Sequence, residues 1–234
     1  MLDKTLVEKK FKNSIEFYDD NAIIQNLMAK KLVSLINKEK FNKILEIGSY
    51  SGILTKEIIN KFDFESYLAL DIVDSFSKIK NLNPKIRFQK IDVEQFYTDE
   101  KFDLIIANAS LQWCNDFNST IKKLKSFLNK DGIIALTTFA TDNFFEIRDA
   151  FNTSLNYKTI EELENIFSKN AKIIQEIHTL QFNFPEEILK HLKLTGVNAI
   201  VKNNFNICDI KNGLKILKEN HKNKLTYKPI YIID

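Results

Sequence analysis

Lys43-Ile-Leu-Glu-Ile-Gly-Ser-Tyr-Ser-Gly52 is the most informative segment of this sequence. It runs from an apolar strand into a tight turn that holds two of the five glycines in this 234-residue chain. Gly48 and Gly52 follow the expected strand and directly precede an expected helix. Glycines at such a place let the backbone turn sharply and let a ligand approach the amides at the helix N-terminus. The stretch therefore predicts a loop that binds a nucleotide-type cofactor.

Strands and helices alternate along the chain after this loop. The expected strands are short and continuously apolar, which is typical of strands buried on both faces of a parallel sheet. Helices between such strands cover the two faces. The pattern therefore predicts an α/β fold with a Rossmann-like, mostly parallel sheet. Strands are expected over 44–47, 67–70, 86–90, 104–107 and 133–139, and helices over 55–62, 75–81 and 117–128, the last of them closed by Gly132.

The segments that flank this alternating region have a different pattern. Helical periodicity dominates both, and the chain contains no internal repeat, low-complexity tract or linker, so we expect one domain. Helices are expected over 143–155, 159–168, 185–194 and 209–220. The parts of the single domain 1–234 are an N-terminal helical lid (1–40), a cofactor-binding core (41–140), a helical cap insertion with one late strand over 172–184 (141–224) and the last strand (225–234).

Composition excludes several classes of protein. The net charge of +3 is too small to indicate nucleic-acid binding. Cys114 and Cys208 are too few for a disulfide framework and lack zinc-type spacing, so no metal site is expected. No apolar run approaches the roughly 18 residues of a membrane span, and the first residues contain no apolar signal region. We therefore expect a cytoplasmic protein that binds neither membrane nor nucleic acid.

Polar side chains follow consecutive expected strands at the point where each strand ends. Asp71 follows the second strand, about 20 residues after the glycine loop, where a carboxylate can accept hydrogen bonds from two ribose hydroxyls. Asp92 follows the third strand, where it can accept from an adenine amine, and Asn108 follows the fourth. The alternatives are a helix cap for Asp71, a plain turn residue for Asp92 and an ordinary strand-end charge for Glu46.

NAD is the competing cofactor, but the loop is Gly-x-x-x-Gly preceded by Glu46, not GxGxxG. The ordered set resembles the class I S-adenosylmethionine-dependent methyltransferases. In that family the first acid and the loop bind the methionyl end, the second acid the ribose and the third acid the adenine. Tyr50 departs from the family, whose members usually carry a third glycine there. The resemblance implies S-adenosylmethionine as cofactor, bound by Glu46, Gly48, Tyr50, Gly52, Asp71, Ile72, Asp92, Val93 and Asn108.

A narrower resemblance rests on two segments. Leu111-Gln-Trp-Cys-Asn-Asp116 and His191-Leu-Lys-Leu-Thr-Gly196 are similar to motifs of the malonyl-acyl-carrier-protein O-methyltransferases of biotin synthesis. The likeness extends over roughly residues 11 to 233. It implies methyl transfer from S-adenosylmethionine to the free carboxylate of a malonyl thioester on acyl carrier protein, with malonyl-coenzyme A as the other thioester to consider.

Arginine usage gives an independent indication. Arg87 and Arg148 are the only arginines among 34 basic residues. Bidentate binding of a carboxylate is a task that lysine does poorly, and the resemblance puts Arg148 where the malonyl carboxylate is held. The alternative is a surface ion pair with Glu146 or Asp149. Tyr18 is the second candidate catalytic residue, as a lid contact, with a plain core aromatic as its alternative.

The partner expected from the resemblance is an acyl carrier protein, which is acidic. Residues 185–234 hold nine lysines against five acids, and Lys122, Lys123 and Lys125 add to the candidate docking charges. The alternative is that scattered lysines form an ordinary solvated surface.

Two other functions stay open at this point. The same fold is compatible with methylation of another small carboxylic acid, such as an aconitate-like acid. It is also compatible with a catalytically silent binding protein in which Tyr50 blocks the cofactor. The sequence does not indicate an oligomeric state.

Overall fold

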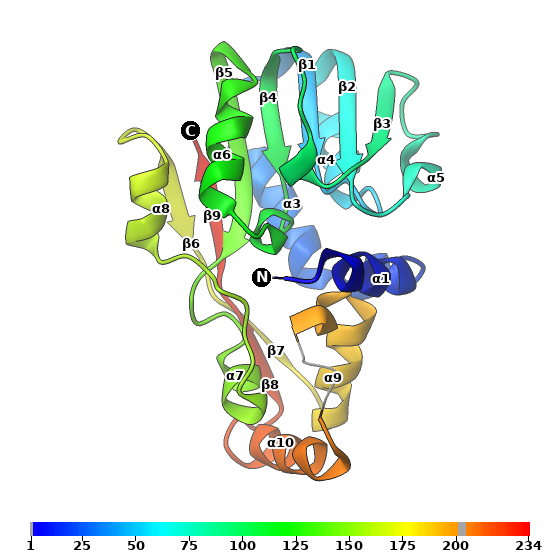
Figure 1. Cartoon of the computed structure of the whole chain (residues 1–234), viewed down its shortest axis with the longest axis vertical. Helices are drawn as coiled ribbons and strands as arrows, with labels where there is room; N and C mark the ends of the chain where they lie inside the picture. The colour runs from blue at the N-terminus through cyan, green and yellow to red at the C-terminus, as the bar shows by residue number, and fades with distance from the viewer. Residues whose placement is uncertain (1, 201–204) are drawn as a thin grey trace.

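The structure, a computed structural model, describes residues 2–200 and 205–234. Its main feature is a seven-stranded sheet in the order β3-β2-β1-β4-β5-β9-β6 (Figure 1). The first five strands run parallel, and β9 is antiparallel to both of its neighbours. The strands are β1 (Lys40–Ile47), β2 (Asp63–Asp71), β3 (Ile86–Lys90), β4 (Phe102–Ala107), β5 (Leu128–Phe139), β6 (Lys172–Gln175) and β9 (Pro229–Ile233).

The sheet buries a separate hydrophobic core on each face. Along β1, Ile44 belongs to one core and Leu45 to the other, because successive side chains of a strand point to opposite faces. The first core contains residues of α3 (Ile23–Ser34) and α4 (Ile53–Lys61), and the second contains residues of α6 (Phe117–Ser126) and α8 (Ile160–Ile166). The α/β fold with a mostly parallel sheet, covered on both faces, is thus confirmed.

A narrower, mostly helical lobe lies below the sheet in the view of Figure 1. Its support is a two-stranded antiparallel ribbon of β7 (His178–Gln181) and β8 (Lys224–Tyr227), which continues from β6 and β9. The helices of the lobe are α7 (Phe145–Phe151), α9 (Pro185–Leu194) and α10 (Ile207–Glu219).

The N-terminal helices lie between the sheet and this lobe (Figure 1). α1 (Lys4–Ser14) packs against α9 and against the short helix η3 (Val197–Ile200), while α2 (Tyr18–Asn21) packs against α3 and α9. The remaining short elements are α5 (Phe76–Ile79), η1 (Val93–Gln95) and η2 (Leu111–Trp113).

Gly132 does not close a helix, so that prediction was wrong. Helix α6 ends at Ser126, and Gly132 lies inside β5 at an irregularity in the pairing of β5 with β4. A Cβ atom at residue 132 would lie 2.9 Å from the carbonyl oxygen of Phe102. The glycine is therefore needed because two strands approach each other closely there.

The late strands also differ from the prediction. The single strand expected over 172–184 is two strands, β6 and β7, and the last strand splits at Lys228 into β8 and β9. Pro229 begins β9, where a residue without an amide hydrogen is tolerated at the start of a strand. Helix α7 is shorter than the expected 143–155, because Phe144 and Asn152 at its two ends adopt left-handed backbone angles.

The described residues contain neither a candidate membrane span nor a candidate metal cluster. None of the helices in residues 2–200 and 205–234 is long and apolar enough to cross a membrane. The same part of the chain contains no group of three or more His, Cys, Asp or Glu residues arranged to hold a metal ion.

Candidate active site

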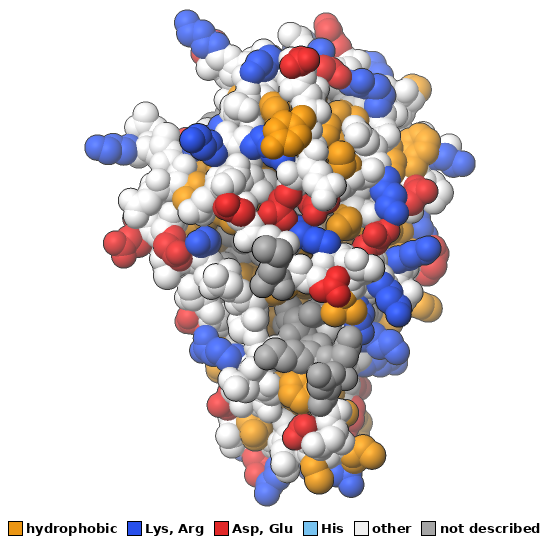
Figure 2. Space-filling model, viewed as in Figure 1, with side chains coloured by type: hydrophobic (Ala, Val, Ile, Leu, Met, Phe, Trp, Pro, Cys, Tyr) orange, Lys and Arg blue, Asp and Glu red, His pale blue; other side chains and the backbone are white. Residues whose placement is uncertain are grey.

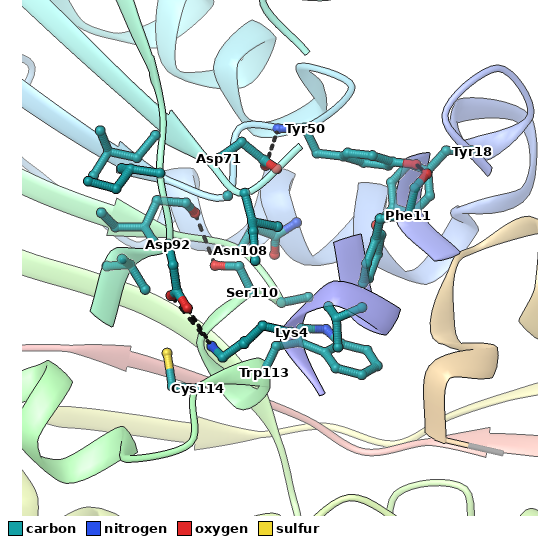
Figure 3. A pocket seen from close by; sticks show the side chains of 18 residues that line it. Lys4, Phe11, Tyr18, Tyr50, Asp71, Asp92, Asn108, Ser110, Trp113 and Cys114 are labelled. Carbon is teal, nitrogen blue, oxygen red and sulfur yellow. Dashed lines mark hydrogen bonds and ion pairs between the residues drawn. The ribbon is translucent and has the colours of Figure 1, made fainter. Parts of the chain in front are cut away.

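A pocket opens at the carboxyl edge of the sheet (Figure 3), where the neighbouring strands β1 and β4 are followed by strands on opposite sides, β2 and β5. Such a switch point is where ligands bind in open α/β sheets. We call this pocket the edge pocket. Eight of the predicted site residues line it: Tyr18, Gly48, Tyr50, Asp71, Ile72, Asp92, Val93 and Asn108.

The glycine loop forms the floor of the edge pocket. Gly48 has a φ of +76°, and a Cβ atom there would lie 2.4 Å from the Cβ of Ser110. Gly52, with a φ of +86°, is the N-cap of α4 and does not line the pocket. Both positions require glycine, because other residues rarely adopt this backbone region and the space beside them is filled.

Asp71 is held at the end of β2 by two backbone amides. Its Oδ2 accepts a hydrogen bond from Tyr50 N at 2.9 Å, and its Oδ1 accepts one from Val73 N at 2.7 Å. Burial raises the pKa of the Asp71 carboxyl to about 6, although these amide bonds act in the opposite direction. The remaining lone pairs of a carboxylate fixed in this way are available to hydroxyl donors of a ligand.

Glu46 lies beneath the pocket and does not line it. Its Oε2 accepts hydrogen bonds from Thr55 Oγ1 at 2.7 Å and Tyr67 Oη at 2.5 Å, while its Oε1 has no partner among the described residues. Burial raises the pKa of the Glu46 carboxyl to about 7, against the effect of the two hydrogen bonds. Glu46 therefore links β1 to α4 and β2 and keeps one acceptor oxygen unused.

The side chain of Tyr50 points away from the strand ends, toward the N-terminal helices (Figure 3). Its hydroxyl donates to Phe11 O at 2.5 Å and lies 3.0 Å from Ser14 Oγ. Its ring makes edge-to-face contacts with Phe11 and Tyr18, with centroids 5.4 and 4.7 Å away. The backbone of Tyr50 has a φ of +39°, so the loop keeps a left-handed turn where the family usually has glycine.

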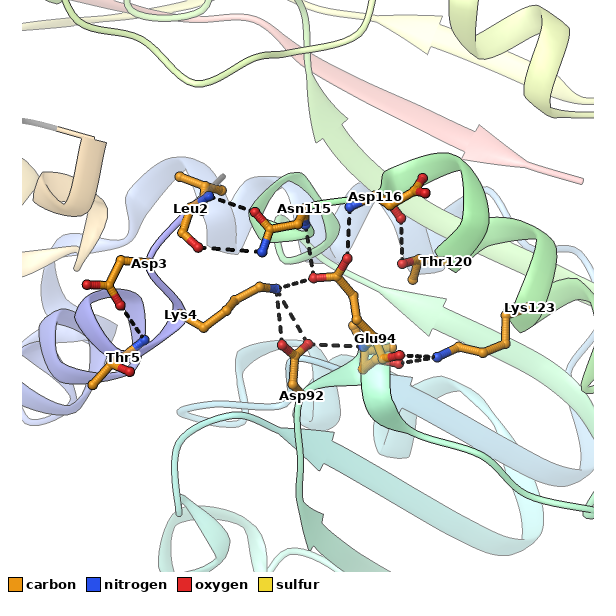
Figure 4. A network of polar contacts seen from close by, with 11 residues as sticks. Leu2, Asp3, Lys4, Thr5, Asp92, Glu94, Asn115, Asp116, Thr120 and Lys123 are labelled. Carbon is orange, nitrogen blue, oxygen red and sulfur yellow. Dashed lines mark hydrogen bonds and ion pairs between the residues drawn. The ribbon is translucent and has the colours of Figure 1, made fainter.

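Lys4 is a pocket residue that the sequence did not reveal. Its Nζ lies 3.3 Å from Asp92 Oδ2 and 2.6 Å from Glu94 Oε2, which ties α1 to the end of β3 (Figure 4). Burial acts to lower the pKa of Lys4, but the hydrogen bond to Glu94 and the nearby negative charges raise it overall. Lys4 and its partners are far apart in the sequence, so no local sequence pattern predicts this contact.

The end of β4 is anchored by its polar side chains. Asn108 Oδ1 accepts from Thr137 Oγ1 at 2.7 Å, and its Nδ2 donates to the backbone oxygen of Gln25 at 2.9 Å. Ser110 Oγ donates to Ile47 O at 3.0 Å. These bonds fix β4 against β1, β5 and α3 at the mouth of the edge pocket.

A second, smaller pocket adjoins the first, between the sheet and the lobe. We call it the inner pocket. Phe11, Tyr18, Ala109 and Trp113 line both pockets and form the boundary between them. The other residues that line the inner pocket are Gln25, Gln112, Phe139, Phe144, Leu155, Tyr157, Thr195, Val197 and Tyr227.

Arg148 lines neither pocket; its side chain is exposed on α7. The ion pair that was its alternative role is also absent from the described residues. Glu146 is buried and accepts from Thr226 N at 3.1 Å, and Asp149 lies 2.7 Å from His221 Nε2. The structure thus brings Tyr18 together with the predicted cofactor residues and leaves Arg148 apart from them.

The chain has clear relatives. The Methyltransferase domain family matches residues 21–190. The malonyl-[acyl-carrier protein] O-methyltransferase of Calditerrivibrio nitroreducens is 34% identical, over 97% of this chain and 94% of that protein.

Solved structures share the fold. The YcgJ protein of Bacillus subtilis superposes with a TM-score of 0.64 at 13% identity, covering 88% of this chain and 96% of that one. The N-methyltransferase NodS of Bradyrhizobium japonicum, solved with S-adenosyl-L-homocysteine, gives a TM-score of 0.54 at 16% identity, covering 76% and 91%. Because the domain family matches and the identity of 34% extends over nearly the whole chain, the chain belongs to the malonyl-[acyl-carrier protein] O-methyltransferase family.

Proposed function

We propose that this protein transfers a methyl group from S-adenosylmethionine to the free carboxylate of a malonyl group on acyl carrier protein. The product is the malonyl-acyl-carrier-protein methyl ester, at the start of pimeloyl and biotin synthesis. The observation that carries the proposal is the 34% identity, across nearly the whole chain, to a relative that bears this name. An edge pocket with a fixed ribose-type acceptor supports it.

The residues of the edge pocket fit an S-adenosylmethionine molecule. Asp71 offers a buried carboxylate for the two ribose hydroxyls, and Gly48, which lines the pocket, lets the loop pack against Ser110. The unused Oε1 of Glu46 can accept from a donor on the methionyl side. Asp92 and Val93 would flank the adenine. When bound there, the cofactor supplies a methyl group on a positively charged sulfur.

The protein's own contribution is alignment and exclusion of water. A carboxylate is already ionised near pH 7, so no general base is needed. Phe11, Tyr18 and Trp113 stand at the boundary of the two pockets, where they can hold the carboxylate oxygen roughly 3–3.5 Å from the methyl group. We propose Tyr18 as the residue that closes over substrate and cofactor.

Esterification has a simple physical result. A malonyl group ends in a charge that an apolar chain-elongation site rejects, whereas its methyl ester is neutral. The ester can therefore be extended like an ordinary acyl chain.

The carboxylate-binding role of Arg148 stays a prediction that variants can test. Arg148→Gln and Arg148→Lys should both lose malonyl transfer if the guanidinium binds the carboxylate, since lysine lacks the bidentate geometry. Arg87→Gln is the matched control, because Arg87 is exposed on β3 and pairs with Glu100. Equal activity of the Arg148 variants and the wild type would remove Arg148 from the site.

Docking of an acidic carrier protein on the lobe is part of the proposal. Lys190 and Lys193 of α9 and Lys211, Lys215 and Lys218 of α10 are exposed. By contrast, Lys123 donates to two backbone oxygens near Glu94, and Lys125 pairs with Asp234 at 2.7 Å. Figure 2 shows both signs of charge interspersed over the visible face, so docking would rest on this local set of lysines.

The deciding experiment is the intact mass of malonyl-acyl-carrier protein after incubation with the protein and S-adenosylmethionine. We expect a gain of one methyl group, with malonyl-coenzyme A as the alternative acceptor run in parallel. No gain on either thioester, with a gain on an aconitate-like acid, would replace the proposed substrate. The cytoplasmic location expected from the sequence stays a prediction.

A further inference from the structure

The inner pocket is lined by neutral side chains. None of the described residues that line it is Lys, Arg, Asp or Glu. His191, the imidazole next to it, lies with its Nε2 2.6 Å from Tyr227 Oη, and burial lowers its pKa to about 4. The imidazole is therefore uncharged near pH 7. A carboxylate that enters this pocket meets no positive charge from the described side chains.

Gln25 has an unused amide at this pocket. Its side chain is 4% exposed, and its Oε1 is buried without a partner. The same side-chain amide carries Nε2, a hydrogen-bond donor. Its backbone, in contrast, is fixed by the bond from Asn108. A buried amide oxygen with no partner is costly to a folded protein, so its presence points to a ligand.

Tyr157 offers a second donor. Its hydroxyl oxygen accepts a hydrogen bond from Asn143 Nδ2 at 3.2 Å, which leaves its own proton for another acceptor. Tyr157 is buried and lines the inner pocket together with Gln25.

We propose that the inner pocket is the acceptor subsite for a short-chain carboxylate, bound by neutral hydrogen-bond donors from Gln25 and Tyr157. Its counter-charge is the sulfonium of the cofactor in the edge pocket. This inference rests on the proposed methyl transfer and deepens it, since it names how the carboxylate is recognised. It also offers an alternative to recognition by Arg148.

The charge balance of the reaction agrees with a neutral pocket. A carboxylate oxygen forms a bond to the methyl carbon, the bond from that carbon to sulfur breaks, and its electron pair stays on sulfur. One negative and one positive charge disappear together. In a pocket without its own cation, the sulfonium is the only positive charge that the attacking oxygen meets. After the transfer, the two pockets hold a neutral ester and a neutral thioether. Carboxylate binding should consequently depend on the charge in the edge pocket.

Trp113 provides the measurement, because it is the only tryptophan of the chain and lines both pockets. Malonyl-pantetheine is titrated into protein loaded either with S-adenosylhomocysteine or with an unreactive analogue that has a protonated amine where the cofactor has its sulfonium. We expect at least tenfold tighter binding with the charged analogue. The methyl ester of malonyl-pantetheine is the control ligand, and its affinity should be the same in both complexes.

The variants Gln25→Met and Tyr157→Phe keep the size of each side chain and remove the donor. Each should weaken malonyl-pantetheine binding to the charged complex about tenfold and leave binding of the methyl ester unchanged. Gln25→Met should also raise the Tm of the free protein by about 2–4 °C, since it removes a buried polar group without a partner. The matched controls are Gln89→Met and Tyr97→Phe, both at exposed positions.

The outcomes separate this inference from the proposed function. Equal malonyl-pantetheine affinity in the two cofactor complexes, unchanged affinity in both variants, or no binding at all would overturn the acceptor subsite. If transfer to malonyl-acyl-carrier protein is observed nonetheless, the proposed function stands and only the subsite fails. If binding depends on charge and on Gln25 but no methyl transfer occurs, the subsite stands and the proposed reaction fails.

Discussion

Replacement of Asp71 by alanine should nearly abolish cofactor binding. The carboxylate is 6% exposed, faces the edge pocket and is held by the amides of Tyr50 and Val73. Two ribose hydroxyls that donate to it would each contribute about 1.5–3 kcal/mol, which is the range for hydrogen bonds to charged groups. Their loss corresponds to a dissociation constant about 10²- to 10⁴-fold larger, at about 1.4 kcal/mol for each factor of ten.

Calorimetric titration with S-adenosylhomocysteine measures this change, and thermal unfolding shows whether the variant is folded. Asp71→Asn keeps one acceptor oxygen and should lose less affinity than Asp71→Ala. Asp74→Ala is the matched control, because Asp74 is exposed three residues further along the chain. If Asp71→Ala binds within about threefold of the wild type while remaining folded, the assignment of the ribose to Asp71 is wrong.

Three further predictions concern the same region. Tyr50→Phe should lower the free energy of unfolding by about 1–2 kcal/mol and speed hydrogen exchange in α1, because the bond to the Phe11 carbonyl is lost; unchanged exchange would contradict this. Lys4→Met should weaken the salt dependence of α1 protection, measured by hydrogen exchange at two ionic strengths, because the pairs with Asp92 and Glu94 are lost while the pair of Glu8 with Lys90 remains. Cofactor affinity, measured by calorimetry from pH 5 to 8, should rise through about pH 6 as Asp71 ionises.

The sign of the effect of Asp71 on stability is opposite to its effect on binding. Its folded pKa of about 6 lies above the ordinary aspartate value of 3.8, so the folded state binds the proton more tightly. The contribution of Asp71 to the free energy of unfolding is therefore fully present below about pH 4 and is lost as pH rises through 6. The raised pKa of Asp71 would be contradicted if, without ligand, the free energy of unfolding of the wild type increased from about pH 4 to 6 while that of Asp71→Asn did not.

The cofactor edge was predictable because its signals are local and its geometry is general. Apolar strands that alternate with helices specify a parallel sheet, and the carboxyl ends of parallel strands meet at one edge. Gly48, Asp71 and Asp92 therefore meet at one pocket although nothing in the sequence states their distances. The cofactor role of each residue stays a prediction until binding is measured.

Other features depend on contacts between distant segments and could not be predicted. The pairing of Lys4 with Asp92 joins the first helix to the third strand, and the inner pocket combines side chains from five separate parts of the chain. Gly132 misled the prediction because a glycine after a helical pattern is a common helix end, whereas here it permits close contact with the backbone of Phe102. The direction of Tyr50 depends on Phe11 and Tyr18, which no neighbouring sequence specifies.

The position of β9 has a consequence for how the chain folds. β9 comes last in the chain order yet lies between β5 and β6, so β6 has no partner in the sheet until residues 229–233 arrive. During synthesis, the parallel part from β1 to β5 can assemble first, while β6 and one edge of β5 remain unpaired. Pairings between distant segments are slow to form, and an unpaired strand edge invites association with other chains. Variants that weaken β9 should consequently reduce the yield of folded protein in cells more than they reduce the stability of the protein once it is folded.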